Sequence, residues 1–551
     1  MVGEPFFAPG VPIVIDRKGL GYAGPGDLAV VSTASRRPRL ERVLGRAESV
    51  ETVLDGLLVE RGERGAVEPY SPPPLDVEGR VDLRKLLAFT IDPETARDFD
   101  DAISVRREPG GGLRAWVHIA DVSYFVPAGS PLDRGAAARG FSVYVPGRVA
   151  PMLPHELADD LCSLRPHEDR LCLTVEIPFG ESLEPGEPRF YRSVIRSRER
   201  LTYDQAEAIL AGREPADAEV AEALGLAERI ALELRKRRFA RGALRIETAE
   251  IAFAFDGRGG VERAWLEAEP HAHALVEELM ILANEAVAGL LAGRRREALY
   301  RVHERPDPQA VGLLLAKLAD LEVPTPPAPD ADRLAPGEAA ALAAQVSERV
   351  AEYVRHSGRG VAAFPALVLR ALKQARYDRR NLGHSGLASP AYCHFTSPIR
   401  RFPDLVVHRA LLRELGLADE PLPEDLPEAA EHVSAREREA AQVEYAADEI
   451  CLAWLLEARL FELGWEHVFE GEIVGLIGSG LFARFGEVFE GFLPARRLPG
   501  DYFELTPLGT ALRGRRGGRT FRLGDPIEVR VEEIRRAEGK VELSLAVGRE
   551  D

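Results

Sequence analysis

The sequence F-T-I-D-P-E-T-A-R-D-F-D-D-A-I-S-V, residues 89–105, carries the pattern on which the interpretation of the whole chain depends. Pro93 ends an apolar, strand-like run, and A-I-S-V at residues 102–105 begins another. Between the two runs lie four aspartates within ten residues: Asp92, Asp98, Asp100 and Asp101. This spacing predicts two buried strands joined by a bent connector that holds four carboxylates.

Carboxylates held this close together need a positive partner. Two of them about 5 Å apart repel by about 3 kcal/mol at an effective dielectric constant of about 20. A hard divalent cation reverses that interaction, and a site made only of oxygen ligands favours Mg²⁺ or Mn²⁺ over zinc. The alternative is a solvated acidic turn, the ordinary role of D-x-D-D. The apolar flanks and the fourth aspartate favour a metal site.

The bulk composition limits the class of protein. The chain has 551 residues, enough for several domains, and it is 45% hydrophobic and 29% charged, as in soluble globular proteins. Its four cysteines form no C-x-x-C pair, which argues against a disulfide scaffold or a structural zinc site. Because no apolar run approaches membrane-spanning length and no signal-peptide pattern is present, we expect a cytoplasmic protein that binds no membrane.

The charge distribution is uneven. The formal net charge of −18 argues against a nucleic-acid partner, but a basic footprint can be local. Three basic clusters occupy residues 192–200, 235–241 and 513–519. Any one of them is typical of a solvated surface. Three in so acidic a chain indicate basic tracks on an acidic body.

Residues 1–78 are predicted to form a small separate domain. Apolar spacing at residues 39–46 and 50–61 predicts two short helices, with Ser49 as a candidate N-cap. Flanked by strand-like runs, they favour a winged helix-turn-helix-like unit, which either contacts nucleic acid or only packs against a neighbour. The sequence Y-S-P-P-P at residues 70–74 is typical of a linker.

The remaining chain predicts a multidomain α+β protein. Residues 79–462 form one large mixed α/β domain, strand-rich to about residue 177 and then mostly helical. Residues 463–551 contain five short strand-like runs with glycine turns, which predict an OB-fold β-barrel. The expected helices of the large domain lie at residues 203–210, 218–238, 272–291, 339–356, 367–376, 405–415 and 429–463.

A second dense motif occupies residues 377–409. Ser397-Pro398 is predicted to introduce a helix that carries Arg400, where the guanidinium and the backbone amides favour an anion. An arginine at a helix start is usually structural. Together with the aspartates, however, Arg400 indicates phosphoryl-transfer chemistry, with metal on one side of the phosphorus and a guanidinium on the other.

Five motifs follow one another along the chain: D-P-x-x-x-x-D-x-D-D (residues 92–101), Y-V-P-G-R-V-A-P-M-L-P-H-E-L-A-D-D-L-C-S-L (144–164), L-T-Y-D-Q-A (201–206), L-V-E-E-L-M-I-L-A-N (275–284) and G-H-x-G-L…Y-x-H-F-T-S-P-I-R-R-F-x-D-L-x-x-H-R (383–409). In this order they resemble the catalytic domain of the ribonuclease II (RNB) family. The C-terminal segments G-L-F-A-R-F and V-E-L-S-L resemble the S-one type of OB fold.

The resemblance implies a processive 3′→5′ exoribonuclease that hydrolyses single-stranded RNA to nucleoside 5′-monophosphates with Mg²⁺, or with Mn²⁺. It implies that Asp92, Asp98 and Asp101 hold metal. Asp100 is implied as the aspartate indispensable for cleavage, which helps to place the attacking water. Arg400 is implied to neutralise charge on the scissile phosphate.

The resemblance also implies contacts to the RNA end. Tyr144 corresponds to a residue that stacks on the 3′-terminal base, a sequence-tolerant contact. Tyr203 and Glu277, with Glu278 as an adjacent alternative, correspond to positions that favour ribose over deoxyribose through the 2′-hydroxyl. Ile246 takes the place where the family often has a second aromatic. The usual paired cold-shock barrels do not fit within residues 1–78.

Aromatic and arginine residues alternate in the C-terminal barrel, as in single-strand binding surfaces. The aromatic residues are Phe482, Phe485, Phe489 and Phe492, interleaved with Arg484, Arg496 and Arg497. About half of the phenylalanines are expected in the barrel core, with Phe482 and Phe485 exposed to RNA.

Two other functions remain open at this point. A catalytically inactive RNA-binding relative would most simply lack a carboxylate, yet all four aspartates and Arg400 are present. A metal phosphohydrolase acting on small substrates would have no use for an OB-like tail and basic tracks. We therefore expect a monomeric enzyme that binds single-stranded RNA.

Overall fold

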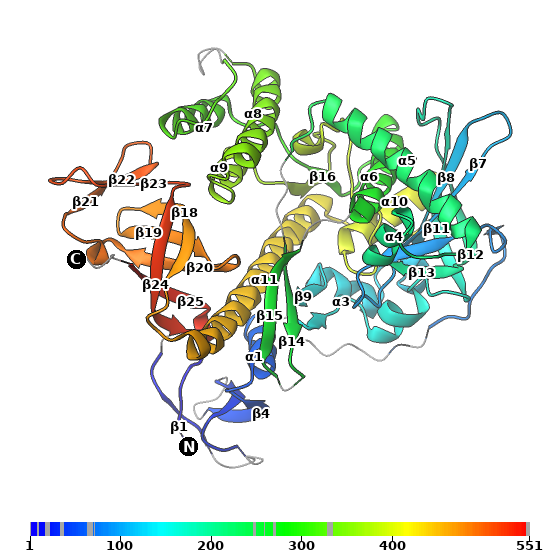
Figure 1. The fold of residues 1–551 in the computed structure, drawn as a ribbon. Coiled ribbons are helices and arrows are strands. Elements are labelled where there is room, and N and C mark those ends of the chain that lie inside the picture. The colour runs from blue at the N-terminus through cyan, green and yellow to red at the C-terminus, as the bar shows by residue number, and fades with distance from the viewer. Residues whose placement is uncertain are drawn as a thin grey trace.

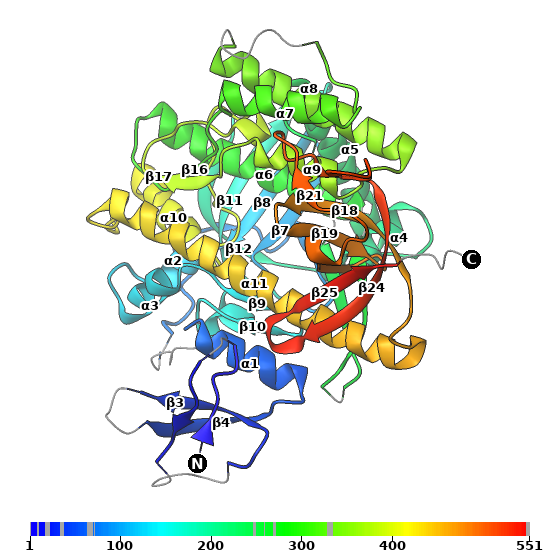
Figure 2. The ribbon, with the colours of Figure 1, turned by 90° about the vertical axis from the view of Figure 1, so that its left-hand side faces the viewer.

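The computed structural model describes residues 2–7, 10–16, 23–33, 38–62, 70, 72–245, 250–257, 259–267, 271–327 and 334–546. A small N-terminal unit, a large mixed domain and a C-terminal barrel follow one another along the chain, and the long helix α11 (Leu426–Leu463) lies against all three (Figures 1 and 2). In the described residues no helix is long and apolar enough to cross a membrane.

In its described residues the N-terminal unit consists of two antiparallel strand pairs and one helix, so the predicted helix-turn-helix is wrong. Residues 39–46 form a strand, not a helix, because they pair with β3. The pairing is interrupted by two register shifts. Such bulges break the alternation of a strand and leave apolar residues at helix-like spacing. The elements are β1 (Val2–Gly3), β2 (Ile13–Val14), β3 (Asp27–Ser32), β4 (Arg39–Arg46) and α1 (Val50–Glu60).

Helix α1 confirms the second predicted N-terminal helix. It buries Val50, Val53, Leu54 and Leu57 in the core that runs under α11. This unit therefore packs against the rest of the protein through apolar side chains. Figure 2 shows α1 next to α11.

A seven-stranded sheet organises the large domain. Its order is β13-β6-β7-β8-β11-β12-β5, antiparallel except for the two outer pairs. Apolar side chains of the sheet, such as Phe89 and Ile103, form one core with α5 and α6. Figure 1 shows these two helices beside the sheet. The strands are β5 (Val81–Asp82), β6 (Phe89–Asp92), β7 (Asp101–Arg107), β8 (Leu113–Ala120), β11 (Asp169–Phe179), β12 (Arg189–Arg196) and β13 (Glu199–Thr202).

The predicted helices of this domain form with shifted ends. The largest shift is at residues 367–376, where the helix ends at Arg370 and residue 376 begins a strand. The helices are α2 (Val122–Phe125), α3 (Pro131–Arg139), α4 (Tyr203–Leu210), α5 (Ala218–Ala240), α6 (His271–Gly293), α7 (Pro308–Asp320), α8 (Pro336–Ser357), α9 (Ala363–Arg370) and α10 (Phe402–Glu414), with short turns η1 (Glu156–Leu161) and η3 (Ser385–Leu387).

In the described part of the large domain, three short strand pairs lie outside the main sheet: β9 (Val143–Val145) with β10 (Arg148–Ala150), β14 (Glu250–Phe255) with β15 (Val261–Glu267), and β16 (Tyr300–Val302) with β17 (Arg376–Asp378). Helix α10 is buried from Phe402 to Leu412, as expected for a helix in the middle of a core. Its position fixes the motif at residues 383–409 against the sheet.

The C-terminal strands close into a five-stranded barrel, as the OB-fold prediction requires. Between β20 and β24 the chain leaves the barrel and forms a separate three-stranded sheet. The barrel strands are β18 (Phe469–Ile477), β19 (Gly480–Phe485), β20 (Phe489–Pro494), β24 (Pro526–Arg535) and β25 (Lys540–Leu545); the extra strands are β21 (Phe503–Leu505), β22 (Ala511–Gly514) and β23 (Thr520–Arg522), with turns η4 (Ala495–Arg497) and η5 (Arg536–Glu538).

Candidate active site

Two strand ends bring the aspartates together. Strand β6 ends at Asp92, and β7 begins at Asp101, beside it in the sheet. Strand β13 runs parallel to β6, with Thr202 in register with Asp92, so Tyr203 at the start of α4 reaches the same edge. The sheet topology therefore produces the predicted carboxylate cluster.

The connector between the two strands is held on both sides. Ser163 Oγ accepts the backbone N–H of Phe99 at 3.1 Å and donates to the carbonyl of Arg97 at 2.7 Å. Arg200 donates to the carbonyls of Pro93 and Glu94, and its guanidinium lies 5.5 Å from the centre of the Phe99 ring. These contacts fix a segment that contains no regular secondary structure.

Burial makes ionisation of these carboxyl groups energetically unfavourable. It raises the pKa of Asp92 to about 6 and, together with the charge of Asp92, raises the pKa of Asp101 to about 7. Burial also raises the pKa of Asp100 well above its usual value. One buried oxygen of Asp92 and one of Asp100 accept no hydrogen bond. The cluster therefore favours either a proton or a cation.

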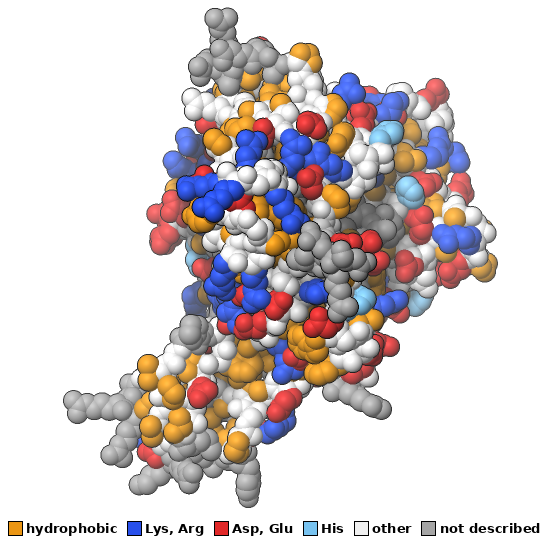
Figure 3. Space-filling model, turned by 60° about the vertical axis from the view of Figure 1, so that its left-hand side comes forward, with side chains coloured by type: hydrophobic (Ala, Val, Ile, Leu, Met, Phe, Trp, Pro, Cys, Tyr) orange, Lys and Arg blue, Asp and Glu red, His pale blue; other side chains and the backbone are white. Residues whose placement is uncertain are grey.

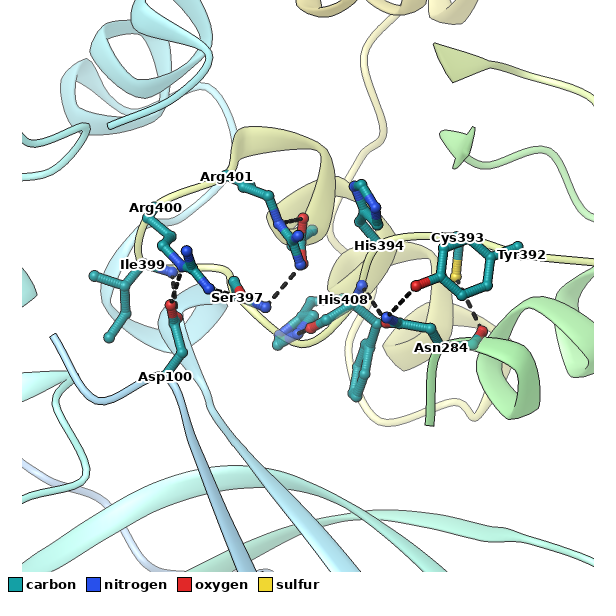
Figure 4. A network of polar contacts seen from close by, with 12 residues as sticks. Asp100, Asn284, Tyr392, Cys393, His394, Ser397, Ile399, Arg400, Arg401 and His408 are labelled. Carbon is teal, nitrogen blue, oxygen red and sulfur yellow. Dashed lines mark hydrogen bonds and ion pairs between the residues drawn. The ribbon is translucent and has the colours of Figure 1, made fainter. Parts of the chain in front are cut away.

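The turn before α10 supplies the positive charge. Ile399 donates its backbone N–H to Asp100 Oδ1 at 2.9 Å, and Arg400 Nε lies 3.3 Å from Asp100 Oδ2 (Figure 4). The expectation that a helix carries Arg400 is wrong, because α10 begins only at Phe402. Arg400 lies in the turn, and the side chain remains about half exposed. An exposed guanidinium beside a buried carboxylate can contact an anionic ligand.

Two buried residues that were not predicted shape this turn. Asp404 accepts the backbone N–H of Ser397 at 2.8 Å and pairs with two nitrogens of Arg401 at 2.8 and 2.9 Å. Asn284 accepts the N–H of Phe395 at 2.8 Å (Figure 4). Both residues lie inside the quoted motifs, so the motifs could have indicated them. The groups that they bind, however, depend on the fold.

Tyr144 lies over the connector. It is 37% exposed, its hydroxyl donates to Asp98 Oδ2 at 2.7 Å, and its backbone N–H donates to Glu444 of α11 at 2.8 Å. The structure thus places Tyr144 beside the aspartates. Glu444 is a further residue that sequence reasoning missed, because nothing in the helical pattern of α11 distinguishes it.

The other predicted RNA contacts have different surroundings. The Tyr203 ring centre lies 5.2 Å from that of His273, and burial, with the nearby Asp101 and Asp92, raises the pKa of Tyr203. Glu277 and Glu278 differ sharply: the Glu278 side chain is 2% exposed and bound by Arg238, whereas that of Glu277 is 38% exposed. Ile246 lies outside the described residues.

The structure of the barrel contradicts one of the predicted RNA contacts. Phe482 is partly exposed, and its ring centre lies 5.0 Å from that of Phe492. Phe485 is 1% exposed and packs in the core with Phe469 and Phe489, so the prediction that it is exposed is wrong. Residues three apart in a strand point to opposite faces, so Phe482 and Phe485 cannot share one.

The donor set fits a hard cation. The cluster offers several carboxylate oxygens, and the buried Oδ2 of Asp92, which accepts no hydrogen bond, is an atom that a cation would satisfy. Among the described residues no three His, Cys, Asp or Glu side chains converge into a ready-made metal site. Asp98 is engaged by Tyr144, so it would have to share its oxygens or turn.

Comparisons with known proteins agree with this geometry. The RNB domain family matches residues 80–416, and the S1 RNA binding domain matches residues 464–546. Ribonuclease R of Escherichia coli (strain K12) is 38% identical over 485 residues, which cover 85% of this chain and 57% of that protein. Ribonuclease R of Aquifex aeolicus (strain VF5) is 36% identical, covering 87% and 66%.

A solved structure gives the same result. Mycoplasma genitalium RNase R in complex with ribose methylated single-stranded RNA matches with a TM-score of 0.86 and 25% identity, over 99% of this chain and 88% of that chain. The chain spans little more than half the length of the E. coli relative. Because the RNB domain match covers more than half of its residues, this chain belongs to the RNB family and carries an S1 domain after the catalytic fold.

Proposed function

We propose that the protein is a processive 3′→5′ exoribonuclease that hydrolyses single-stranded RNA to nucleoside 5′-monophosphates. The observation that carries the proposal is the contact of Arg400 with Asp100, within a buried carboxylate cluster, in a chain of the RNB family. The names of the Ribonuclease R relatives, and the RNA bound to the M. genitalium enzyme, support the same substrate class.

Asp92, Asp98 and Asp101 are the proposed holders of Mg²⁺, or of Mn²⁺ in its place, and Asp100 is the proposed catalytic aspartate. When bound, the cation supplies Lewis acidity toward water and phosphate oxygens. Asp100 receives the N–H of Ile399 on Oδ1, and its Oδ2, which lies beside Arg400, would orient the attacking water. Arg400 would then meet the negative charge that grows on the phosphate in the transition state.

The RNA end is proposed to lie between Tyr144 and the start of α4. Tyr144 would stack on the terminal base, and Tyr203 and Glu277 would contact the ribose. Of the two adjacent glutamates, Glu277 is favoured because Glu278 is committed to Arg238. Ile246 is proposed as an aliphatic counterpart to Tyr144. On the barrel, Phe482 and Phe492 form the aromatic pair available to bases.

The proposed organisation has its boundaries after residues 78 and 462. We propose that the N-terminal unit, the catalytic domain and the S1 barrel act as one monomer in the cytoplasm. Sedimentation of the purified chain with and without RNA tests the monomer, and a second copy in either state would contradict it.

A time course on 5′-labelled single-stranded RNA with Mg²⁺ tests the activity. We expect the label to move directly to a very short product without intermediate lengths, and expect Asp100→Asn or EDTA to abolish this shortening. Tight RNA binding without shortening would overturn the proposal and identify an inactive RNA-binding relative. Hydrolysis of small phosphodiesters without RNA binding would identify a phosphohydrolase for small substrates.

A further inference from the structure

The hairpin formed by β9 and β10, residues 143–150, carries Tyr144 and shares a core with the N-terminal unit. Val143 and Val145, which flank Tyr144 in β9, are buried in the apolar cluster that also contains the apolar side chains of α1. Because side chains alternate along a strand, Tyr144 lies on the opposite, exposed face, where its hydroxyl reaches Asp98. One side of this hairpin therefore belongs to the core with α1, and the other side to the candidate active site.

Arg148 of this hairpin bonds directly to α1. Its Nη1 donates to Asp55 Oδ1 at 2.5 Å, and its Nη2 donates to Glu51 Oε2 at 3.1 Å. Glu51 and Asp55 are four residues apart, so they project from the same face of the helix. Two carboxylates on one guanidinium fix its orientation as well as its position. The side chains of Arg148 and Asp55 are 27% and 19% exposed, so salt screens their attraction less than at an open surface.

The register of the hairpin couples the position of Arg148 to that of Tyr144. Arg148 is the cross-strand partner of Val145, and the next residue of β10 is the partner of Tyr144. In the turn between the strands, Gly147 has a φ of +72°, and a Cβ on this glycine would lie 3.3 Å from the ring of Phe255 in β14. A short turn packed against an aromatic ring leaves the two strands little freedom to move separately. A displacement of Arg148 would therefore displace the ring of Tyr144.

Helix α1 also contacts the hairpin of β14 and β15, against which the turn at Gly147 packs. The backbone N–H of Val50 donates to the carbonyl of Gly259 at 3.2 Å. A Cβ on Gly259 would lie 2.8 Å from Ser49 Oγ, so the two backbones approach closely. One helix of the N-terminal unit therefore holds two hairpins that pack on each other beside the candidate active site.

The charge of α1 does not suit a contact with RNA. The helix carries three acidic residues and no basic one. Figure 3 shows mainly hydrophobic side chains on the N-terminal unit, at the bottom of the view, and Lys and Arg side chains gathered above it. Because phosphate contacts require positive charge, α1 is better suited to hold neighbouring segments than to bind RNA.

We infer that α1 positions the ring of Tyr144 through Arg148, which makes Glu51, Asp55 and Arg148 positioning residues for binding of the RNA end. The inference rests on the proposed function, in which Tyr144 stacks on the terminal base. Of the two roles that the sequence left open for the N-terminal unit, it selects packing against a neighbour, and it gives that packing a task at the active site.

The sign of the expected effect separates this role from simple electrostatics. Glu51 and Asp55 are negative, so neutralising them would by charge alone strengthen the binding of a polyanion. If they position Tyr144, the same change weakens binding, because the ring no longer lies where it meets the base. Stacking on an aromatic ring contributes a factor of about 5 to 150 in affinity. Partial displacement of the ring should cost about 3- to 10-fold.

The test measures affinity for a short oligo(U) in an Asp100→Asn background, which does not consume the RNA. The test variant is Glu51→Gln/Asp55→Asn. The matched control, Glu48→Gln/Glu60→Gln, removes the same charge from exposed residues near the two ends of α1. Thermal unfolding verifies that every variant folds.

Two further variants and a second measurement make the test specific to Tyr144. In a Tyr144→Ala background the test variant should lose less than about a further twofold, because no ring remains to be displaced. Arg148→Lys keeps the charge but loses the planar fork, so it should weaken binding in the same direction and by less. Hydrogen exchange of residues 143–150 without RNA should accelerate in the test variant and in Arg148→Lys, and not in the control.

A loss of about 3- to 10-fold in the test variant, absent from the control and from the Tyr144→Ala background, supports the inference. Unchanged or tighter binding by the test variant overturns it, and so does an equal loss in the Tyr144→Ala background. If Tyr144→Ala binds as tightly as its parent, the proposed stacking contact fails and the inference fails with it. A parent chain that does not bind the oligonucleotide contradicts the proposed function itself, which is a separate result.

Discussion

Two regions of this protein gather like charges, and they differ in burial. In the catalytic domain, Asp92 and Asp100 are buried; one oxygen of Asp92 accepts no hydrogen bond, and Asp100 has the guanidinium of Arg400 at 3.3 Å. On the barrel, Arg513, Arg516 and Arg519 face solvent. Like charges about 5 Å apart repel by about 3 kcal/mol near a protein and by less than about 1 kcal/mol in water, where salt screens them further.

The comparison shows what a gathering of like charge means in each place. A buried cluster persists only where a cation, a guanidinium or a proton offsets the charge, so it indicates a site of large energetic consequence. An exposed cluster costs little and can act only through many weak, salt-dependent contacts. The two regions should therefore respond very differently to substitution.

The largest effect is expected for Asp100→Asn. Because this residue contacts both Ile399 and Arg400, its loss should lower the rate of RNA hydrolysis by about 10⁴-fold. The melting temperature without divalent ions should not fall, because burial already disfavours the ionised form. Single-turnover kinetics and calorimetry measure the two quantities. A loss of less than tenfold would remove Asp100 from the chemistry.

A contrast within the barrel sharpens the distinction between buried and exposed groups. Phe485→Ala should destabilise the protein by about 3–5 kcal/mol, because Phe485 fills the core. Phe482→Ala should change stability by less than about 1 kcal/mol and weaken RNA binding by about 1–3 kcal/mol. Denaturant unfolding and RNA titration separate the pair. The reverse pattern would contradict the strand register.

These positions also show how much of the structure can be predicted from the sequence alone. The aspartate spacing, Pro93 and the flanking apolar runs are local signals, and they predicted the connector correctly. The errors arose where contacts with other segments determine the secondary structure. Residues 39–46 form a strand because they pair with β3, through a ladder that contains bulges. The bonds of Asp404 and Glu444 are also set by distant segments, so no local pattern contains them.

The effect of divalent cations on stability should distinguish the two regions without a measurement of activity. Mg²⁺ at about 100 times its Kd should stabilise the protein by about 2.7 kcal/mol, because it binds only the folded cluster. Asp92→Asn/Asp101→Asn should abolish this stabilisation, and Arg513→Ala/Arg516→Ala/Arg519→Ala on the barrel should keep it. Thermal unfolding in a Mg²⁺ series measures the effect. Equal stabilisation of all three proteins would place the cation elsewhere.

Tyr144 lies between the two regimes, because its ring is exposed and its hydroxyl is bound to Asp98, so Tyr144→Ala should have a modest effect. Loss of the stacking face should weaken binding of the RNA end by about 1–3 kcal/mol. Tyr144→Phe keeps the ring and removes only the hydroxyl, so it should retain most of this affinity while it frees Asp98. Affinity for short RNA, measured in the Asp100→Asn background, distinguishes the two substitutions. Equal losses in both would assign the contribution of Tyr144 to its hydrogen bond and not to stacking.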